Sequence, residues 1–174
     1  MTDAATTPSR DRPPLVADER TQLIGWYDAQ RAIIHLKCRG LSEADAHRSL
    51  LPTSPLMTVA GLVSHLRWAE QLWFEMVFLD RPATGPGFDG VEDSEMMVDG
   101  VPLAGLLDAY AAQCAVSNEI IAGHSLDDTG RYTGDPEGGA TLRWMVLHML
   151  EETARHAGHL DTIRELLDGR KSYY

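Results

Sequence analysis

The chain is poor in cysteine, in positive charge and in long apolar runs, and each shortage excludes a class of protein. Its 174 residues include 2 cysteines, Cys38 and Cys114, each alone in a helical pattern, so we expect reduced core residues rather than a disulfide framework. Lys and Arg number 15 against 26 Asp and Glu, and the resulting net charge of −11 repels phosphate backbones and anionic lipid headgroups. No apolar run reaches the roughly 20 residues of a membrane span, and the first residues lack the apolar core of a signal peptide. We therefore expect a soluble, cytoplasmic protein that binds neither nucleic acid nor a membrane.

Helical periodicity dominates the rest of the sequence. Residues 1–17 have little to bury and are expected to form a disordered lead. Four amphipathic segments of about twenty residues or more follow, and each begins or ends at a capping residue. They lie at 18–40, 58–79, 102–123 and 141–169, with a short helix expected at 42–49. The pattern predicts an all-α protein, a four-helix bundle with long inter-helix loops over residues 18–170, followed by a tail at 171–174.

Two long connections separate the later helices. Residues 80–101 are rich in Gly, Pro and acidic side chains and are expected to form a loop without an element of its own. Residues 124–140 form the second loop. Loops of this length in compact domains often act as lids over functional sites.

The last helix carries polar groups on a face that should be buried. Met145, Met149, Glu152, His156, His159 and Ile163 recur at intervals of four, three, four, three and four, which places them on one stripe. The stripe is apolar at both ends and holds a carboxylate and two imidazoles in its middle. Such groups are costly to bury without partners, and a divalent metal ion would satisfy imidazole nitrogen and carboxylate oxygen together.

A second inward stripe supplies a third polar group. In residues 58–79, the apolar stripe through Leu62, Ala69 and Leu72 is interrupted by His65. If the two helices are neighbours, His65, Glu152 and His156 can converge on one point. Three protein ligands leave coordination positions open, which is typical of a catalytic rather than a structural metal.

Several alternatives remain open from spacing alone. A single core histidine is usually hydrogen-bonded, and a Glu followed four residues later by a His is common on exposed faces. His148 also lies four residues before Glu152, and His159 is either a fourth ligand, a proton-handling group or a group facing the substrate. His35 and His47 are expected at the surface. A ferritin-like di-iron centre is disfavoured because it needs two Glu-x-x-His pairs.

The segments GLVSHLRWAEQLWFEMVF and LRWMVLHMLEETARHAGHLDTIRELLDG resemble the DinB/YfiT superfamily of four-helix bundles, in particular the branch related to mycothiol-dependent S-transferases. The resemblance spans roughly residues 18 to 170. It is most specific where a ligand pair four residues apart is followed by x-Gly-His, matched by Glu152, His156, Gly158 and His159. Many members use three histidines. This chain departs from that pattern at Glu152. Its two histidines and one glutamate resemble the ligand set of mycothiol-dependent maleylpyruvate isomerases.

The resemblance implies metal ligands His65, Glu152 and His156, and a low-molecular-weight thiol as co-substrate. Zinc fits the ligand set best, with nickel, iron or manganese as alternatives. A thiol activated by the metal would add to an electrophilic small molecule, and we expect His159 to handle a proton or orient a neighbour. We also expect a homodimer, because bundles of this kind often pair through an exposed apolar helix face. The alternatives are a non-catalytic or regulatory metal-binding bundle, and a metal-dependent hydrolase or oxygenase without a thiol.

Overall fold

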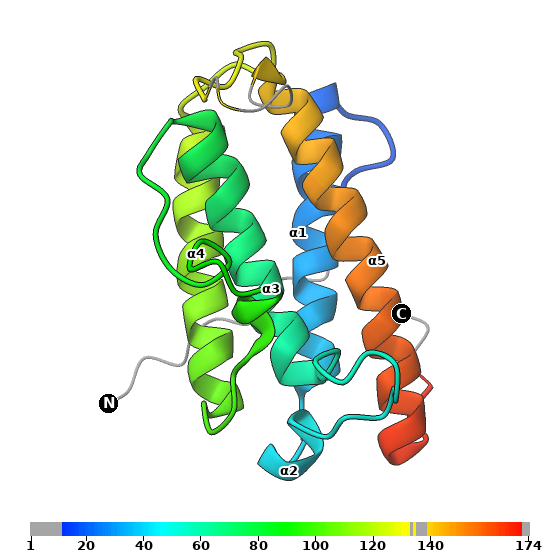
Figure 1. The fold of residues 1–174 in the computed structure, drawn as a ribbon. Coiled ribbons are helices and arrows are strands. Elements are labelled where there is room, and N and C mark those ends of the chain that lie inside the picture. Colours follow the sequence, from blue (N-terminus) through cyan, green and yellow to red (C-terminus); the bar gives the residue numbers. More distant parts are fainter. Residues whose placement is uncertain (1–11, 133, 135–138, 172–174) are drawn as a thin grey trace, which may run out of the picture.

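The computed structural model describes residues 12–132, 134 and 139–171 (Figure 1). Within them the predicted four-helix bundle is confirmed. The long helices are α1 (Glu19–Cys38), α3 (Val59–Glu70) continued by η1 (Gln71–Phe78), α4 (Leu103–Ala122) and α5 (Leu142–Asp168). Most of the expected lead, residues 1–11, and most of the expected tail, residues 172–174, lie outside the described residues. No helix among the described residues is both long enough and apolar enough to cross a membrane.

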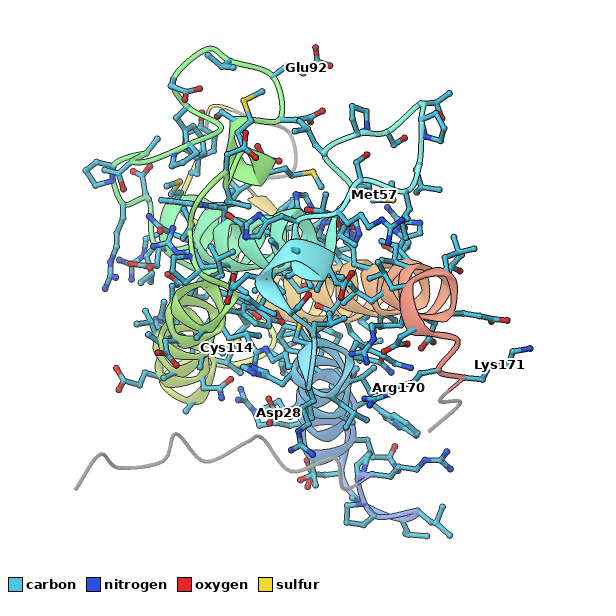
Figure 2. The ribbon with its side chains drawn as sticks, turned by 90° about the horizontal axis from the view of Figure 1, so that it is seen from below. Asp28, Met57, Glu92, Cys114, Arg170 and Lys171 are labelled. Atoms are coloured by element: carbon cyan, nitrogen blue, oxygen red, sulfur yellow. The ribbon has the colours of Figure 1, made fainter. Side chains whose placement is uncertain are left out.

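The topology explains the length of the connection between the second and third long helices. Helices α1 and α5 run in one direction, and α3 and α4 run in the other (Figure 1). Because α3 and α4 are parallel, the connection 80–101 has to return along the length of the bundle. Seen from below, this segment stands outside the helices, with Glu92 at its outer edge (Figure 2).

The helices begin where the sequence predicts. The side chains of Asp18, Ser42, Thr58 and Thr141 each accept a hydrogen bond from a backbone N–H three residues later. Such N-caps satisfy donors that the first helical turn leaves unpaired. Helix α5 ends at Gly169, whose φ of 72° is the left-handed conformation that favours glycine. The short helix α2 (Glu43–Ala46) is briefer than the predicted 42–49.

The expected stripe of α3 holds only in part beyond Glu70, because the helix widens there into the π-helix η1. A π-helix has more residues per turn than an α-helix, so the inward face moves to other positions. Met76 of the expected stripe is buried, but Phe74, Val77 and Phe78 are buried as well, whereas Leu72 is only partly buried. Helix α1 differs as well. Trp26 is 42% exposed although it lies in an apolar helical pattern, and Arg31 is buried.

The predictions for His35, for His47 and for segment 80–101 also need correction, whereas the prediction for the cysteines is confirmed. His35 stacks on Tyr110 with ring centroids 5.7 Å apart, and His47 contacts the carbonyl of Val101, so neither is a fully solvated surface histidine. The segment 80–101 contains a short 3-10 helix, η2 (Ser94–Met96), which the sequence analysis did not predict. Cys38 is buried, Cys114 is partly buried, and both are free thiols as predicted.

Candidate metal centre

His65 of α3 and Glu152 and His156 of α5 meet between the two helices. The Nε2 atom of His65 lies 3.0 Å from Oε1 of Glu152, and Nε2 of His156 lies 2.9 Å from the same oxygen. One ligand atom from each of the three residues lies within 4.8 Å of the other two. The structure therefore brings together the three residues that the sequence predicts as ligands.

The local packing of α5 leaves this group at the edge of the core. Thr153 and Ala157, one position further round the helix, are 0% and 5% exposed and face the other helices. The side chains of Glu152 and His156 are 13% and 12% exposed. The apolar ends of the predicted stripe are buried, but its middle lies one residue away from the centre of the buried face, so the polar groups border solvent.

Glu95 of η2 contacts the other side of the His65 ring. Nδ1 of His65 lies 3.2 Å from Oε1 of Glu95, and the Ser64 hydroxyl donates to the Glu95 carbonyl at 2.6 Å. A carboxylate on the distal nitrogen of a histidine fixes the ring so that the other nitrogen can bind a metal. Glu95 could not be recognised from the sequence, because no signal distinguishes it from the other acidic residues of the 80–101 segment.

The segment 80–101 lies close against α3 beside this contact. A Cβ on Gly85 would lie 2.1 Å from the Trp68 indole, and the φ of Gly85 is +96°, so only glycine fits there. The Gly87 amide donates to the Ser94 hydroxyl at 2.6 Å, which ties the two halves of the segment together. The segment thus carries Glu95 to His65 in a defined conformation.

His159 contacts Nδ1 of His156, as Glu95 contacts Nδ1 of His65. The two Nδ1 atoms are 3.2 Å apart. Burial and the charges of His156 and Arg155 lower the pKa of His159, which favours a neutral ring. A neutral His159 can accept a hydrogen bond from the Nδ1–H of His156, and on metal binding a deprotonated Nε2 of His156 would face the ion instead of donating to Glu152.

The electrostatics keep Glu152 ionised. Hydrogen bonds from His156 and His65 lower the pKa of Glu152 far below its usual value, against the opposing effect of burial. Burial by itself would lower the pKa of His65, but the hydrogen bonds with Glu152 and Glu95 outweigh it and the net shift is upward. Arg155 adds a contact of 3.2 Å from Nη1 to the second oxygen of Glu152.

The donor set fits a divalent metal ion. Bonds of about 2.0–2.1 Å in tetrahedral geometry place ligand atoms roughly 3.3 Å apart, slightly more than the nitrogen–oxygen distances found here. All three ligand atoms lie within 4.8 Å of one another, so small adjustments of the side chains would bring them to this spacing around an ion. Two imidazole nitrogens and one carboxylate oxygen are ligands that zinc and non-haem iron accept.

A cavity of about 320 Å³ adjoins the group. His65 and Glu152 line it, together with Trp68, Trp73 and residues 86–88 of the long connection. His148 also lines this cavity and stacks on Trp144, with ring centroids 5.2 Å apart. Among the described residues, neither His148 nor His159 belongs to the group of converging ligand atoms.

A model of the family described as mycothiol-S-transferase matches residues 22–169. The chain belongs to this family. The match confirms the resemblance to DinB/YfiT-type bundles, and in this mycothiol-S-transferase family member it includes His65, Glu95 and all of α5. No curated protein and no solved structure matches the chain significantly.

Proposed function

We propose that this protein is a metal-dependent enzyme that transfers a hydrophilic, low-molecular-weight thiol to an electrophilic small molecule. The observation that carries the proposal is the convergence of His65, Glu152 and His156 beside an open cavity in a member of the mycothiol-S-transferase family. A divalent ion bound there would supply Lewis acidity that favours the nucleophilic thiolate form of a thiol at neutral pH.

The chain's own residues would hold and orient the reacting groups. His65, Glu152 and His156 are the proposed ligands, and Glu95 and His159 fix their ring orientations through Nδ1. In the reaction the thiol sulfur forms a bond to an electrophilic carbon. Either a leaving group departs with its bonding electrons, or a proton completes an addition that can later be reversed to give isomerisation.

The state of the two cysteines supports an external thiol as the nucleophile. Burial raises the pKa of Cys38 to about 12. Burial also raises the pKa of Cys114, and the nearby charge of Glu70 adds to this. A thiol is nucleophilic only as thiolate, so neither cysteine suits catalysis near neutral pH.

The cavity beside His65 and Glu152 favours an enzyme over a structural metal site, because a structural site is usually closed by a fourth protein ligand. A hydrolase without a thiol would use the same residues, and activity screens separate the two. Zinc as the ion, a homodimeric assembly and a cytoplasmic location stay predictions.

A cobalt-substituted protein tests the proposal. Addition of mycothiol should produce a sulfur-to-cobalt charge-transfer band in the near ultraviolet, and the band should be missing in His156→Ala. No such band with mycothiol, bacillithiol or glutathione would contradict the thiol function.

A further inference from the structure

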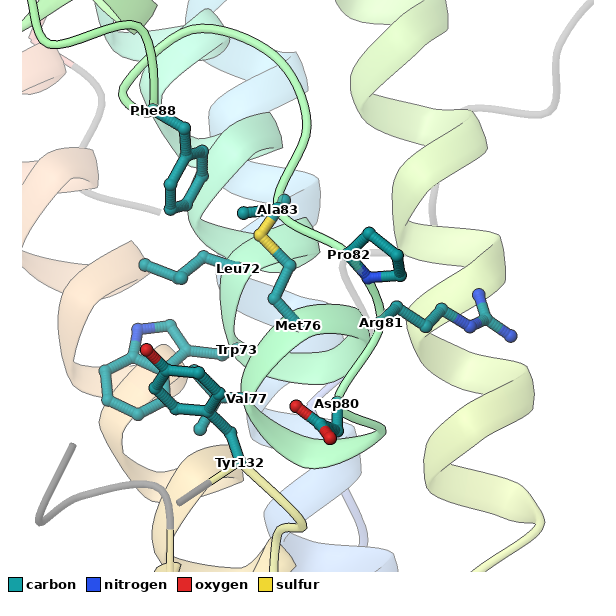
Figure 3. Close-up of a pocket in the computed structure, with 10 residues that line it drawn as sticks. All are labelled: Leu72, Trp73, Met76, Val77, Asp80, Arg81, Pro82, Ala83, Phe88 and Tyr132. Carbon is teal, nitrogen blue, oxygen red and sulfur yellow. The ribbon is translucent and has the colours of Figure 1, made fainter. Parts of the chain in front are cut away.

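A second, larger cavity lies next to the one beside the candidate metal centre. Its volume is about 590 Å³, which is in the range of small-molecule sites. Residues of η1, of the start of segment 80–101 and of the segment before α5 form its walls (Figure 3). They are Leu72, Trp73, Met76, Val77, Asp80, Arg81, Pro82, Ala83, Phe88 and Tyr132.

The two cavities adjoin one another at three shared lining residues. Leu72, Trp73 and Phe88 line both of them. The smaller cavity reaches His65 and Glu152, whereas the larger one extends along η1 away from them. The larger cavity therefore borders the cavity that reaches the candidate metal centre.

The end of η1 holds Tyr132 over this cavity. The carbonyls of Val77 and Phe78 accept hydrogen bonds from the backbone N–H groups of Tyr132 and Arg131, at 3.2 and 3.1 Å. These carbonyls end the helix and would otherwise lack partners. The π-helix thus has a local consequence, since it both supplies one wall and anchors the residue that forms another.

The lining is apolar, and its charges do not favour an anion. The side chain of Arg81 binds Glu75 and points away from the cavity (Figure 3). The other charged lining residue is Asp80, which is negative. A hydrophilic thiol needs many hydrogen-bonding partners, and an anionic substrate needs a positive charge, so neither matches this space.

We infer that the 590 Å³ cavity binds the neutral, ring-bearing part of the electrophilic acceptor, with its reactive carbon directed past Trp73 toward His65 and Glu152. The inference rests on the proposed function for the acceptor role, but the binding of an apolar ring can be measured separately. For a benzylic chloride, the sulfur–carbon bond forms, the carbon–chlorine bond breaks, chloride takes the bonding pair and the thiol proton goes to solvent.

A pair of fluorescent probes tests the ligand class in the metal-loaded, full-length protein. N-phenyl-1-naphthylamine is neutral, and 1-anilinonaphthalene-8-sulfonate has the same rings with an added negative charge. The neutral probe should bind at one site per chain, at least about tenfold more tightly than the sulfonate. Equal affinity for the two probes would overturn the preference for a neutral ligand.

The variant Ala83→Trp tests the location, because it fills the cavity from an exposed loop position and carries little risk to the fold. It should weaken binding of the neutral probe by at least about tenfold. The matched control, Ala115→Trp on an exposed position of α4, should bind the probe as the wild type does. Wild-type affinity in Ala83→Trp would overturn the assignment.

Transfer assays separate this inference from the proposed function. In Ala83→Trp, transfer of mycothiol to 4-nitrobenzyl chloride should fall by about tenfold, while transfer to the much smaller iodoacetamide should stay within about twofold. An equal loss with both acceptors would overturn the acceptor role of the cavity. Probe binding without transfer to either acceptor would support the binding site and contradict the thiol-transfer function.

Discussion

Two polar groups interrupt the apolar interior of the bundle, and they differ in how completely their members are paired. In the first, Glu70 is 0% exposed and accepts hydrogen bonds from Tyr27 at 2.5 Å and from Nε and Nη2 of Arg31 at 2.7 Å each. The third nitrogen of Arg31, Nη1, donates hydrogen bonds to Asn118 at 2.7 Å and to Asp28 at 2.9 Å. This buried network satisfies its charges within the protein.

In the candidate metal centre, one oxygen of Glu152 is shared by His65 and His156, and a cavity adjoins them. Glu70 lies within the core, and Glu152 lies at the edge of the buried face of α5. A carboxylate inside a helical bundle therefore does not by itself indicate a metal-binding site. The indication comes from ligand atoms that converge on one side and are held in orientation from the other, as Glu95 and His159 do here.

Removal of a proposed ligand should have the largest effect. His65→Ala and His156→Ala should each reduce the metal content of untagged protein from about one ion per chain to almost none, because two remaining ligands cannot hold the ion. The control His47→Ala removes a histidine outside the site and should keep its metal. Plasma emission spectrometry of the purified proteins measures the content. Full metal occupancy in both site variants would refute the ligand assignment.

Loss of Glu70 should have the next largest effect. It should lower the stability of the fold rather than the metal content. Glu70→Ala removes the buried partner of Arg31 and leaves only the exposed Asp28, so the free energy of unfolding should fall by about 3–5 kcal/mol. Replacing both residues, as in Arg31→Met with Glu70→Leu, should recover most of that loss. Urea denaturation measures both. If Glu70→Ala is as stable as the wild type, the buried network has no structural role.

Glu95→Gln should have an intermediate effect on the metal. Without the carboxylate on Nδ1 of His65, metal affinity should fall by roughly 10–100-fold, measured by competition with a chromophoric chelator. Glu92→Gln makes the same change at an exposed position of the same segment and should bind metal as the wild type does. Equal affinities in the two variants would show that Glu95 does not orient His65.

The smallest effect is expected at the cysteines. Because burial raises the pKa of Cys38 to about 12 and also raises that of Cys114, neither thiol should react with a disulfide reagent in native protein between pH 7 and about pH 9. Both should react after unfolding in urea. A fast-reacting native thiol would weaken the argument that the nucleophilic sulfur comes from a separate molecule.

The sequence predicted the elements that have strong local signals. The caps Asp18, Thr58 and Thr141 mark helix starts through their own hydrogen bonds, so the bundle could be inferred without tertiary information. The convergence of His65 with Glu152 and His156 also followed from helical spacing, given adjacent helices.

Other features depend on contacts far apart in the sequence. The π-helix moves the buried face to Phe74 and Val77, and an α-helical periodicity cannot predict it. Glu95 reaches His65 only because the parallel arrangement of α3 and α4 returns its segment along the bundle. Arg31 is buried because Glu70 pairs with it across 39 positions of sequence.

X-ray absorption spectroscopy of the zinc-reconstituted protein, before and after addition of mycothiol, tests the central claim most directly. The account predicts a first shell of nitrogen and oxygen atoms at about 2.0–2.1 Å from two imidazoles, one carboxylate and solvent, and one added sulfur at about 2.3 Å with the thiol. A protein sulfur or a third imidazole in the first shell, or no added sulfur with the thiol, would contradict it.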